Sequence, residues 1–197
     1  MSRQLLYCVL ALAACSGEPS ECCKHAAADA ATAAGSSDDA DARAAVHIPD
    51  VVLVDQRGRR VRLHDLVGGK RVIIDFVFTT CTSVCPTLQT VMQGVQQRLG
   101  DRLGTDTVLL SISVDPANDT PERLQAFAAD YGARAGWHFL TGAPADVIDV
   151  LRAFGVYTSR KEEHSAMFVL GDERRGRWMY QSGFADPAAI VARLEAL

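Results

Sequence analysis

The sequence has little excess charge of either sign, no second pair of cysteines in its globular part and no internal repeat. Its formal net charge of −4 argues against a nucleic-acid-binding surface. Six of the 24 acidic and three of the 20 basic residues precede residue 47, so the remainder is nearly neutral. Hydrophobic residues make up 48% of the 197 positions, which is enough for the core of one domain with extra segments.

The apolar run near the N-terminus, Leu5–Ala14, is too short to cross a bilayer, because it has about ten residues where a helix needs roughly 20. With Arg3 before it, the run has the features of an export signal. It ends in "LAAC", which resembles a bacterial lipobox and implies cleavage before Cys15 and lipidation of its sulfur. An ordinary secretory signal or an apolar N-terminal helix is the alternative. We therefore expect residues 1–14 to be a lipoprotein signal peptide, and the exported protein to be lipid-anchored on the periplasmic side of a bacterial membrane.

The segment that follows lacks large apolar side chains altogether. Residues 16–45 consist mainly of Ala, Ser, Asp and Gly, a composition that cannot bury enough surface to offset the entropy of ordering. We therefore expect residues 15–46 to form a flexible tether, and residues 47–197 to form the globular domain.

Hydrophobic patterning predicts alternating strands and helices in the globular part. Strands are expected as a pair within 51–63 around a turn at Arg57-Gly58, and as buried strands over 71–78 and 107–114. Helices are expected from the apolar spacing over 84–99, after the N-cap and proline of Thr120-Pro121, over about 145–154, and after Asp186-Pro187. A hairpin is expected around "GDERRGR", between "AMFVL" and "RWMYQSG".

The expected order is hairpin, strand, helix, strand, helix, helix, hairpin, helix. A strand–helix–strand unit followed by an antiparallel hairpin favours a mixed sheet covered on both faces. The predicted fold class is therefore α/β. It is a thioredoxin-like fold with a central mixed β-sheet flanked by helices and an N-terminal β-hairpin extension.

The segment "FVFTTCTSVCPTLQ" places Cys81 and Cys85 between a buried strand and a helix. Proline is tolerated only in the first turn of a helix, so Pro86 predicts a helix that begins near Thr82 or Ser83. The free N–H groups and dipole at such a start favour thiolate. The spacing permits a disulfide or a metal clamp. In an oxidising compartment we expect the disulfide unless metal or a reductant keeps the pair reduced.

The number of residues between the two cysteines narrows the choice of chemistry. Three residues separate them, whereas thioredoxin-type oxidoreductases have two. Zinc sites with short spacings use two such pairs, and this domain has one. Two soft thiolates and one imidazole suit Cu(I). A purely structural disulfide is the alternative, which a strand–helix junction disfavours.

A third ligand would come from one of five histidines. His25 lies in the tether, and His47 lies at the edge of the domain. His64 is expected to be a solvated hairpin residue, and His138 a satisfied sheet residue that alternates with its aromatic neighbours. In a thioredoxin-like sheet the loop that enters the last hairpin passes beside the cysteine turn, which makes His164 the best geometric candidate. An ordinary loop histidine is the alternative.

Four segments carry a resemblance to a known family: "FVFTTCTSVCPT", "SISVDPANDTPERLQAF", "WHFLTG" and "HSAMFVLGDERRGR". They resemble the SCO/SenC family of copper-binding, thioredoxin-like proteins of cytochrome c oxidase assembly, over residues 47–197. The "CCKH" of Cys22 to His25 (with Cys23) lies outside the resemblance. It is expected to be linker, with copper collection near the membrane as the alternative.

The resemblance implies a copper site of Cys81, Cys85 and His164, with the two cysteines also acting as a redox pair. It implies Cu(I) or Cu(II) as the metal, and oxidase subunit II or another copper protein as the client. A periplasmic thiol reductant is a further implied partner. Asp115 is implied as an accessory residue that contacts copper or helps a partner dock, and capping of the following turn is its alternative role.

Two functions share these cysteines. A metallochaperone is not an enzyme in the turnover sense and needs His164. A thiol–disulfide oxidoreductase that reduces client cysteines needs only the two sulfurs. A thiol peroxidase is disfavoured, because no single cysteine lies in a Pro/Thr-rich peroxidatic context. The segment between "YTSR" and His164 is shorter than in many members of the family, which leaves the partner less determined than the metal.

Overall fold

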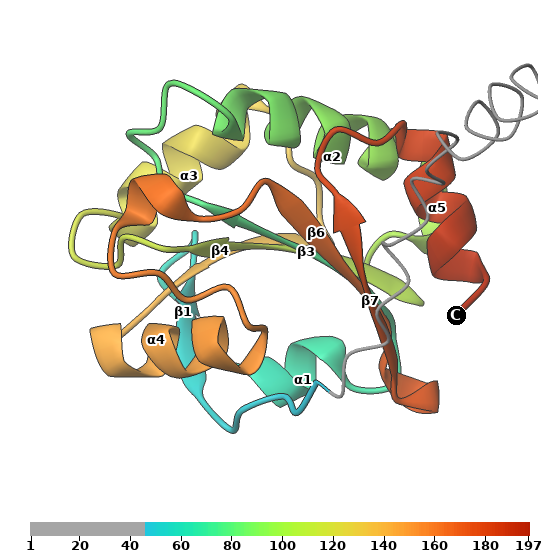
Figure 1. Ribbon diagram of the computed structural model, residues 1–197, viewed down its shortest axis with the longest axis horizontal. Coiled ribbons are helices and arrows are strands. Elements are labelled where there is room, and N and C mark those ends of the chain that lie inside the picture. Colours follow the sequence, from blue (N-terminus) through green and yellow to red (C-terminus); the bar gives the residue numbers. More distant parts are fainter. Residues whose placement is uncertain (1–45) are drawn as a thin grey trace, which may run out of the picture. The chain divides into compact units, whose positions relative to one another are not determined.

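The structure is a computed structural model that describes residues 46–197 (Figure 1). The predicted signal peptide, the lipidation at Cys15 and the "CCKH" segment therefore lie outside the described residues. Among residues 46–197, no helix has the length and apolar character that crossing a membrane requires.

A seven-stranded mixed sheet forms the centre of the fold, with the strand order β2-β1-β5-β4-β3-β6-β7. The strands β3, β4 and β5 are parallel to one another, and the remaining neighbours are antiparallel. The strands are β1 (Val52–Asp55), β2 (Arg60–Arg62), β3 (Arg71–Val77), β4 (Thr107–Ser113), β5 (Trp137–Thr141), β6 (Met167–Asp172) and β7 (Arg177–Ser182).

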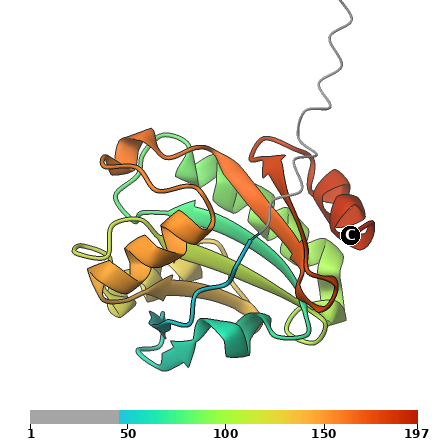
Figure 2. The ribbon, with the colours of Figure 1, turned by 60° about the horizontal axis from the view of Figure 1, so that its bottom comes forward.

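Helices cover both faces of this sheet, as the two ribbon views show (Figure 1, Figure 2). The helices α2 (Cys85–Leu99), α3 (Pro121–Asp130) and α5 (Pro187–Glu195) pack on one face. The helices α1 (Leu63–Val67) and α4 (Pro144–Ala153) pack on the other. Short 3-10 turns are η2 (Gly100–Arg102), η3 (Lys161–Glu163) and η4 (Glu173–Arg175). The predicted fold class is confirmed.

The interior strand β3 contributes to the apolar cores on both faces. Ile73 belongs to the core under α2, α3 and α5, whereas Val72 and Ile74 belong to the core under α1 and α4. This alternation follows from the two-residue period of a strand. Since neither face of β3 meets water, the sequence after Arg71 is almost continuously apolar, and Asp75 is the one acidic residue of the strand.

Two helices begin as the sequence predicts. The Thr120 hydroxyl accepts a hydrogen bond from the Arg123 N–H at the start of α3, and the Asp186 carboxylate accepts one from the Ala188 N–H at the start of α5. In both cases a proline occupies the first helical position, where it has no hydrogen bond to lose.

Three expectations about local structure were wrong. Helix α2 begins at Cys85 rather than near Thr82 or Ser83, because no side chain caps an earlier turn and Pro86 fits the second helical position. Leu63, expected in a strand, starts the short helix α1, which also carries His64. The expected order lacked β5, which is the third parallel strand and joins the N-terminal hairpin to the sheet.

Candidate metal and redox site

Cys81 and Cys85 lie at the carboxyl end of β3, one on each side of the turn that leads into α2. The Cys81 N–H donates to the Phe78 carbonyl at 3.0 Å, and the Cys85 N–H donates to the Cys81 Sγ at 3.4 Å. Cys85 is fully buried and Cys81 is 8% exposed, and both are free thiols. They form a small cluster with Phe78. The turn therefore holds two sulfur atoms together behind one aromatic ring.

The two thiols differ in acidity. Burial by itself would raise the pKa of Cys81, but hydrogen bonds from Cys85 and Ser83 outweigh it and leave that pKa below its ordinary value. Burial raises the pKa of Cys85 to about 12, with further contributions from Cys81 and the Asp75 charge. Cys81 is thus the more acidic thiol of the pair, and Cys85 keeps its proton near neutral pH.

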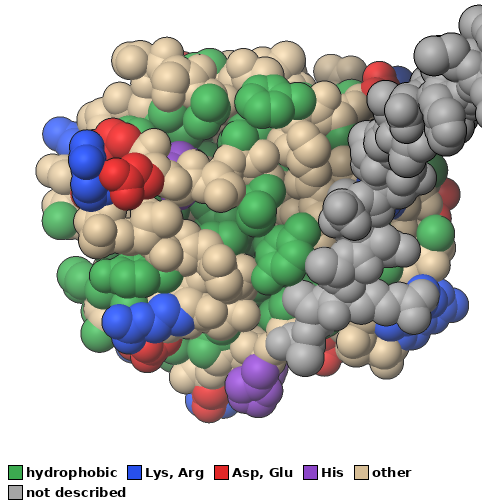
Figure 3. All heavy atoms as spheres, viewed as in Figure 1, with side chains coloured by type: hydrophobic (Ala, Val, Ile, Leu, Met, Phe, Trp, Pro, Cys, Tyr) green, Lys and Arg blue, Asp and Glu red, His purple; other side chains and the backbone are tan. Residues whose placement is uncertain are grey.

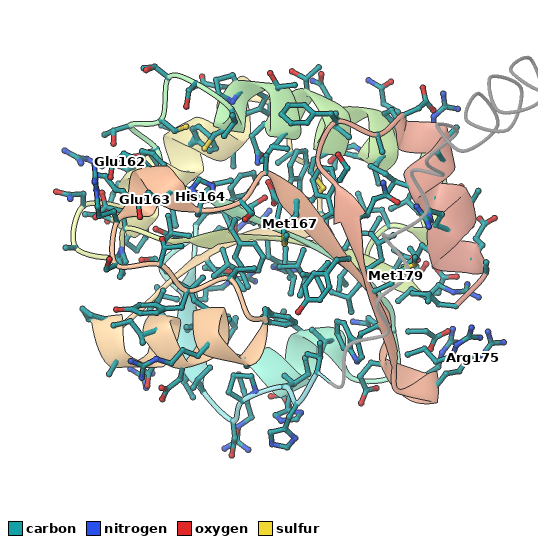
Figure 4. All side chains as sticks on the ribbon, viewed as in Figure 1. Glu162, Glu163, His164, Met167, Arg175 and Met179 are labelled. Atoms are coloured by element: carbon teal, nitrogen blue, oxygen red, sulfur yellow. The ribbon has the colours of Figure 1, made fainter. Side chains whose placement is uncertain are left out.

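His164 follows the η3 turn and precedes β6, and its side chain is 7% exposed. Its ring meets the Phe78 ring edge-on, with centroids 5.7 Å apart. His164 thus packs against the aromatic ring that covers the two cysteines. Figure 4 shows Glu162 and Glu163 further out on the same segment, and both are exposed.

Both ring nitrogens of His164 face backbone carbonyl oxygens. Nδ1 lies 2.6 Å from the Lys161 oxygen, and Nε2 lies 3.2 Å from the Phe76 oxygen. A neutral imidazole has a single N–H, so it can donate to only one of these carbonyls. Nδ1 makes the shorter of the two contacts. Among residues 46–197, no group of three His, Cys, Asp or Glu side chains stands in metal-binding geometry.

The remaining described histidines are less suited to this site. His47 and His64 are exposed, as expected for solvated residues. His138 is half-buried in β5, where burial lowers its pKa below the ordinary value despite the nearby Asp55. His164 is the one described histidine that is buried and in contact with the cysteine cluster.

Asp115 lies near the segment that carries His164, and its carboxylate is already paired with other protein groups. Lys161 Nζ is 2.5 Å from Oδ2, and the Asn118 amide donates to both carboxylate oxygens at 2.9 Å. Burial would raise the pKa of Asp115, but these two partners hold it below its usual range. Its carbonyl also accepts the N–H groups of Asn118 and Asp119, so the capping role predicted as the alternative is present.

Sequence reasoning missed Asp119, which ties the cysteine turn to the loop after β4. Its fully buried carboxylate accepts from the Thr79 N–H at 3.1 Å and the Thr79 hydroxyl at 2.6 Å. The Ser113 hydroxyl donates to the Asp119 carboxylate at 2.6 Å. The Ser113 Oγ also accepts a hydrogen bond from the Asp115 N–H at 3.0 Å. The "VDPANDTP" motif contains this residue, but no local pattern relates it to a turn 40 positions earlier.

Sequence reasoning also missed Asp75, a fully buried carboxyl on the α2 side of β3. Ser111 Oγ donates to it at 2.6 Å, and the Gln89 amide donates to its other oxygen. Burial raises the pKa of Asp75 to about 7 in spite of these donors. Gln89 lies one helical turn after Cys85, so Asp75 lies beneath the buried cysteine. A lone acid in an apolar strand was the signal that could have found it.

The donor set fits a soft metal ion better than a hard one. The two thiols and one imidazole are ligands that Cu(I) accepts. The nearby carboxylates of Asp115 and Asp119 already accept hydrogen bonds from protein donors. Binding by all three groups needs the His164 ring to turn away from the Phe76 carbonyl. The sulfur pair needs no such change.

Comparison with known proteins identifies the family. The SCO1/SenC family model matches residues 39–197. The chain belongs to the SCO1/SenC family. The SCO1 protein homolog of Bacillus subtilis is 35% identical over 128 residues, which cover 60% of this chain and 65% of that protein. An Arabidopsis thaliana mitochondrial SCO1 homolog is 29% identical over 60% of this chain and 34% of its own length. The chain thus spans between about a third and two thirds of these curated relatives.

Solved structures of the same family share the fold. A SCO1/SenC family lipoprotein from Bacillus anthracis matches with a TM-score of 0.68 and 26% identity, covering 80% of this chain and 98% of that one. Bradyrhizobium japonicum ScoI, solved with copper bound, matches with a TM-score of 0.64 and 28% identity, covering 76% and 99%. BsSco, described as a Sco-family cytochrome c oxidase assembly protein with a disulfide switch, matches with a TM-score of 0.66 and 27% identity, covering 78% and 94%.

Proposed function

We propose that this protein is a copper chaperone that holds its metal through Cys81, Cys85 and His164 and assists assembly of the binuclear copper site of cytochrome c oxidase. The observation that carries the proposal is the meeting of two free thiols and one buried imidazole on the ring of Phe78. A copper-bound relative and a relative in oxidase assembly support the choice of metal and pathway.

Each residue has a distinct part in loading the cargo. Cys81 supplies the more readily ionised sulfur, because hydrogen bonds lower its pKa. Cys85 gives up its proton only as copper binds, since burial raises its pKa to about 12. His164 adds a neutral imidazole through a ring nitrogen and makes Cu(II) accessible as well as Cu(I), because imidazole suits both states. Burial keeps most of both sulfurs away from bulk water.

Anchoring and partners belong to the same proposal. Residues 1–14 are a lipoprotein signal peptide, Cys15 carries lipid, and residues 15–46 are a tether on the periplasmic side of a bacterial membrane. A family relative from Bacillus anthracis is a lipoprotein, which supports this placement. The client is oxidase subunit II or another copper protein. A periplasmic thiol reductant opens the Cys81–Cys85 disulfide that forms when the metal is absent.

A second function, thiol–disulfide oxidoreductase, is favoured by one specific observation. The pKa values of the two thiols are shifted in opposite directions, as an attacking and a resolving cysteine require. In that role the Cys81 thiolate attacks a client disulfide and forms a mixed disulfide, and one client sulfur leaves as thiolate and takes a proton. Cys85 then loses its proton, attacks Cys81 Sγ and releases the second client thiol, leaving the pair oxidised and the client reduced by two electrons.

The experiment that separates the two functions is His164→Ala, with His138→Ala as the matched control. We expect His164→Ala to weaken Cu(I) binding, abolish stable Cu(II) binding and impair oxidase assembly, while Cys81 and Cys85 still cycle between dithiol and disulfide. His138→Ala should lower stability without changing the copper spectrum. Wild-type binding of both copper states by His164→Ala, with assembly intact, would contradict the ligand assignment. Loss of copper with normal assembly would instead favour the reductase.

A further inference from the structure

The segment that carries His164 is held down by the side chain of Lys161. Lys161 Nζ lies 2.5 Å from Asp115 Oδ2 and 5.1 Å from the centre of the Phe78 ring. The Lys161 carbonyl is also the oxygen 2.6 Å from His164 Nδ1. One residue therefore binds the β4–α3 loop through its side chain and orients the imidazole through its backbone.

The point to which Lys161 is attached is rigid. The Asp115 carboxylate accepts a hydrogen bond from the Asn118 amide, and the Asp115 backbone N–H donates to Ser113 Oγ. The Ser113 hydroxyl in turn donates to Asp119. Asp119 binds Thr79, two residues before Cys81. The chain of contacts thus runs without a gap from the cysteine turn through the β4–α3 loop to the histidine segment. The short η3 turn joins this chain of contacts through the Lys161 side chain.

The η3 turn has few other ties. Its remaining ion pair, Arg160 to Glu163 at 3.1 Å, lies within the segment itself and joins two largely exposed side chains. The space-filling view shows basic and acidic side chains together at this corner of the described domain (Figure 3). Beside it a groove of about 500 Å³, lined by Asp115 and Lys161 among others, leaves room for the segment to move.

We propose that Lys161 is a positioning residue of the site, whose ion pair with Asp115 holds His164 on the Phe76 and Lys161 carbonyls and must open before the imidazole joins the cysteines. The copper arm of this inference rests on the proposed function. Protein in the held arrangement binds copper through two sulfurs, and protein in the released arrangement binds through three ligands. The ion pair therefore lowers the apparent affinity by the fraction of molecules that it keeps held.

The first test needs no metal. Lys161→Met in the full chain should speed amide hydrogen exchange at Glu163 and His164 by roughly two- to fivefold, because a partly exposed ion pair contributes only modestly. Arg160→Met is the control for exchange at His164 alone, because it removes an adjacent positive charge and the Glu163 ion pair without touching Asp115. It should leave His164 exchange nearly unchanged. Asp115→Asn should match Lys161→Met, and the double variant should add nothing further. Unchanged exchange in Lys161→Met overturns the proposal.

The second test measures Cu(I) affinity of the reduced full chain by competition with a chromophoric chelator. Lys161→Met should bind Cu(I) roughly two- to fivefold more tightly than the wild type. In a His164→Ala background the same substitution should have no effect, whereas a general charge effect on the cation would persist there. Weaker binding by Lys161→Met, or an equal gain without His164, overturns the proposal. If the wild type binds no Cu(I), the proposed function fails. The amide hydrogen-exchange measurement then decides by itself whether the Lys161–Asp115 ion pair restrains His164.

Discussion

The backbone N–H of Cys85 donates a hydrogen bond to the Sγ of Cys81 across one turn, at 3.4 Å. This bond contributes to the difference between the two thiols, because it stabilises negative charge on Cys81, whereas burial raises the pKa of Cys85. It exists because Cys85 is the first residue of α2, where the N–H has no partner within the helix. The start of the helix thus selects which sulfur is the nucleophile.

Alkylation of the reduced protein near neutral pH should follow this difference. We expect Cys81 to react with iodoacetamide at least about a hundredfold faster than Cys85, since the Cys85 pKa of about 12 leaves almost no thiolate. Mass analysis of time points gives both rates. The Cys81→Ser variant should be nearly inert and Cys85→Ser should remain reactive. Equal rates at the two positions would show that the hydrogen bond does not control reactivity.

Asp75 should make stability depend on pH in an unusual direction. Its pKa is raised to about 7 in the folded state from its ordinary value of 3.8, so between these pH values the folded protein holds a proton that the unfolded chain loses. The free energy of unfolding should therefore be highest below about pH 4 and fall as pH rises toward 7, by at most about 4 kcal/mol from this group.

Asp75→Asn should remove that part of the pH dependence and raise stability near pH 7 and above. Urea unfolding of both proteins at a series of pH values measures the difference, and common contributions from other groups cancel. Ser111→Ala, which removes a donor to the carboxylate, should lower stability at high pH more than at low pH. An Asn variant that is less stable than the wild type at every pH would contradict the assignment.

Cys15→Ser should release the protein from the membrane fraction, because the lipid that the "LAAC" sequence implies would have no attachment point. Fractionation after salt and carbonate washing, followed by immunoblotting, makes the measurement. Cys22→Ser is the matched control, since it lies in the same segment and should leave the protein membrane-bound. Retention of Cys15→Ser with the membranes would rule out this anchor.

Much of the fold could be predicted because its signals are local. The Thr120-Pro121 and Asp186-Pro187 starts and the apolar spacing of α2 each depend on residues within a few turns. The strand β5 was left out of the expected order, although His138 was expected in a sheet and Gly136 and Gly142 flank the strand, because a short apolar run does not by itself distinguish a strand from a buried helix segment. The start of α2 was misplaced because Pro86 limits the first turn without fixing its first residue.

The sequence by itself determined the cysteine pair, its place between a strand and a helix, and the resemblance that named the family. The tertiary structure decided what surrounds the pair. Phe76 is 88 positions from His164, and Asp115 is 46 positions from Lys161, so no local pattern relates them. The contacts arise because β3, β4 and β6 are neighbours in one sheet whose order is not the order of the chain. Strand pairing, which depends on burial across the whole domain, brings the imidazole, its carbonyl partners and the Lys161 ion pair to the end of β3 that carries the cysteines.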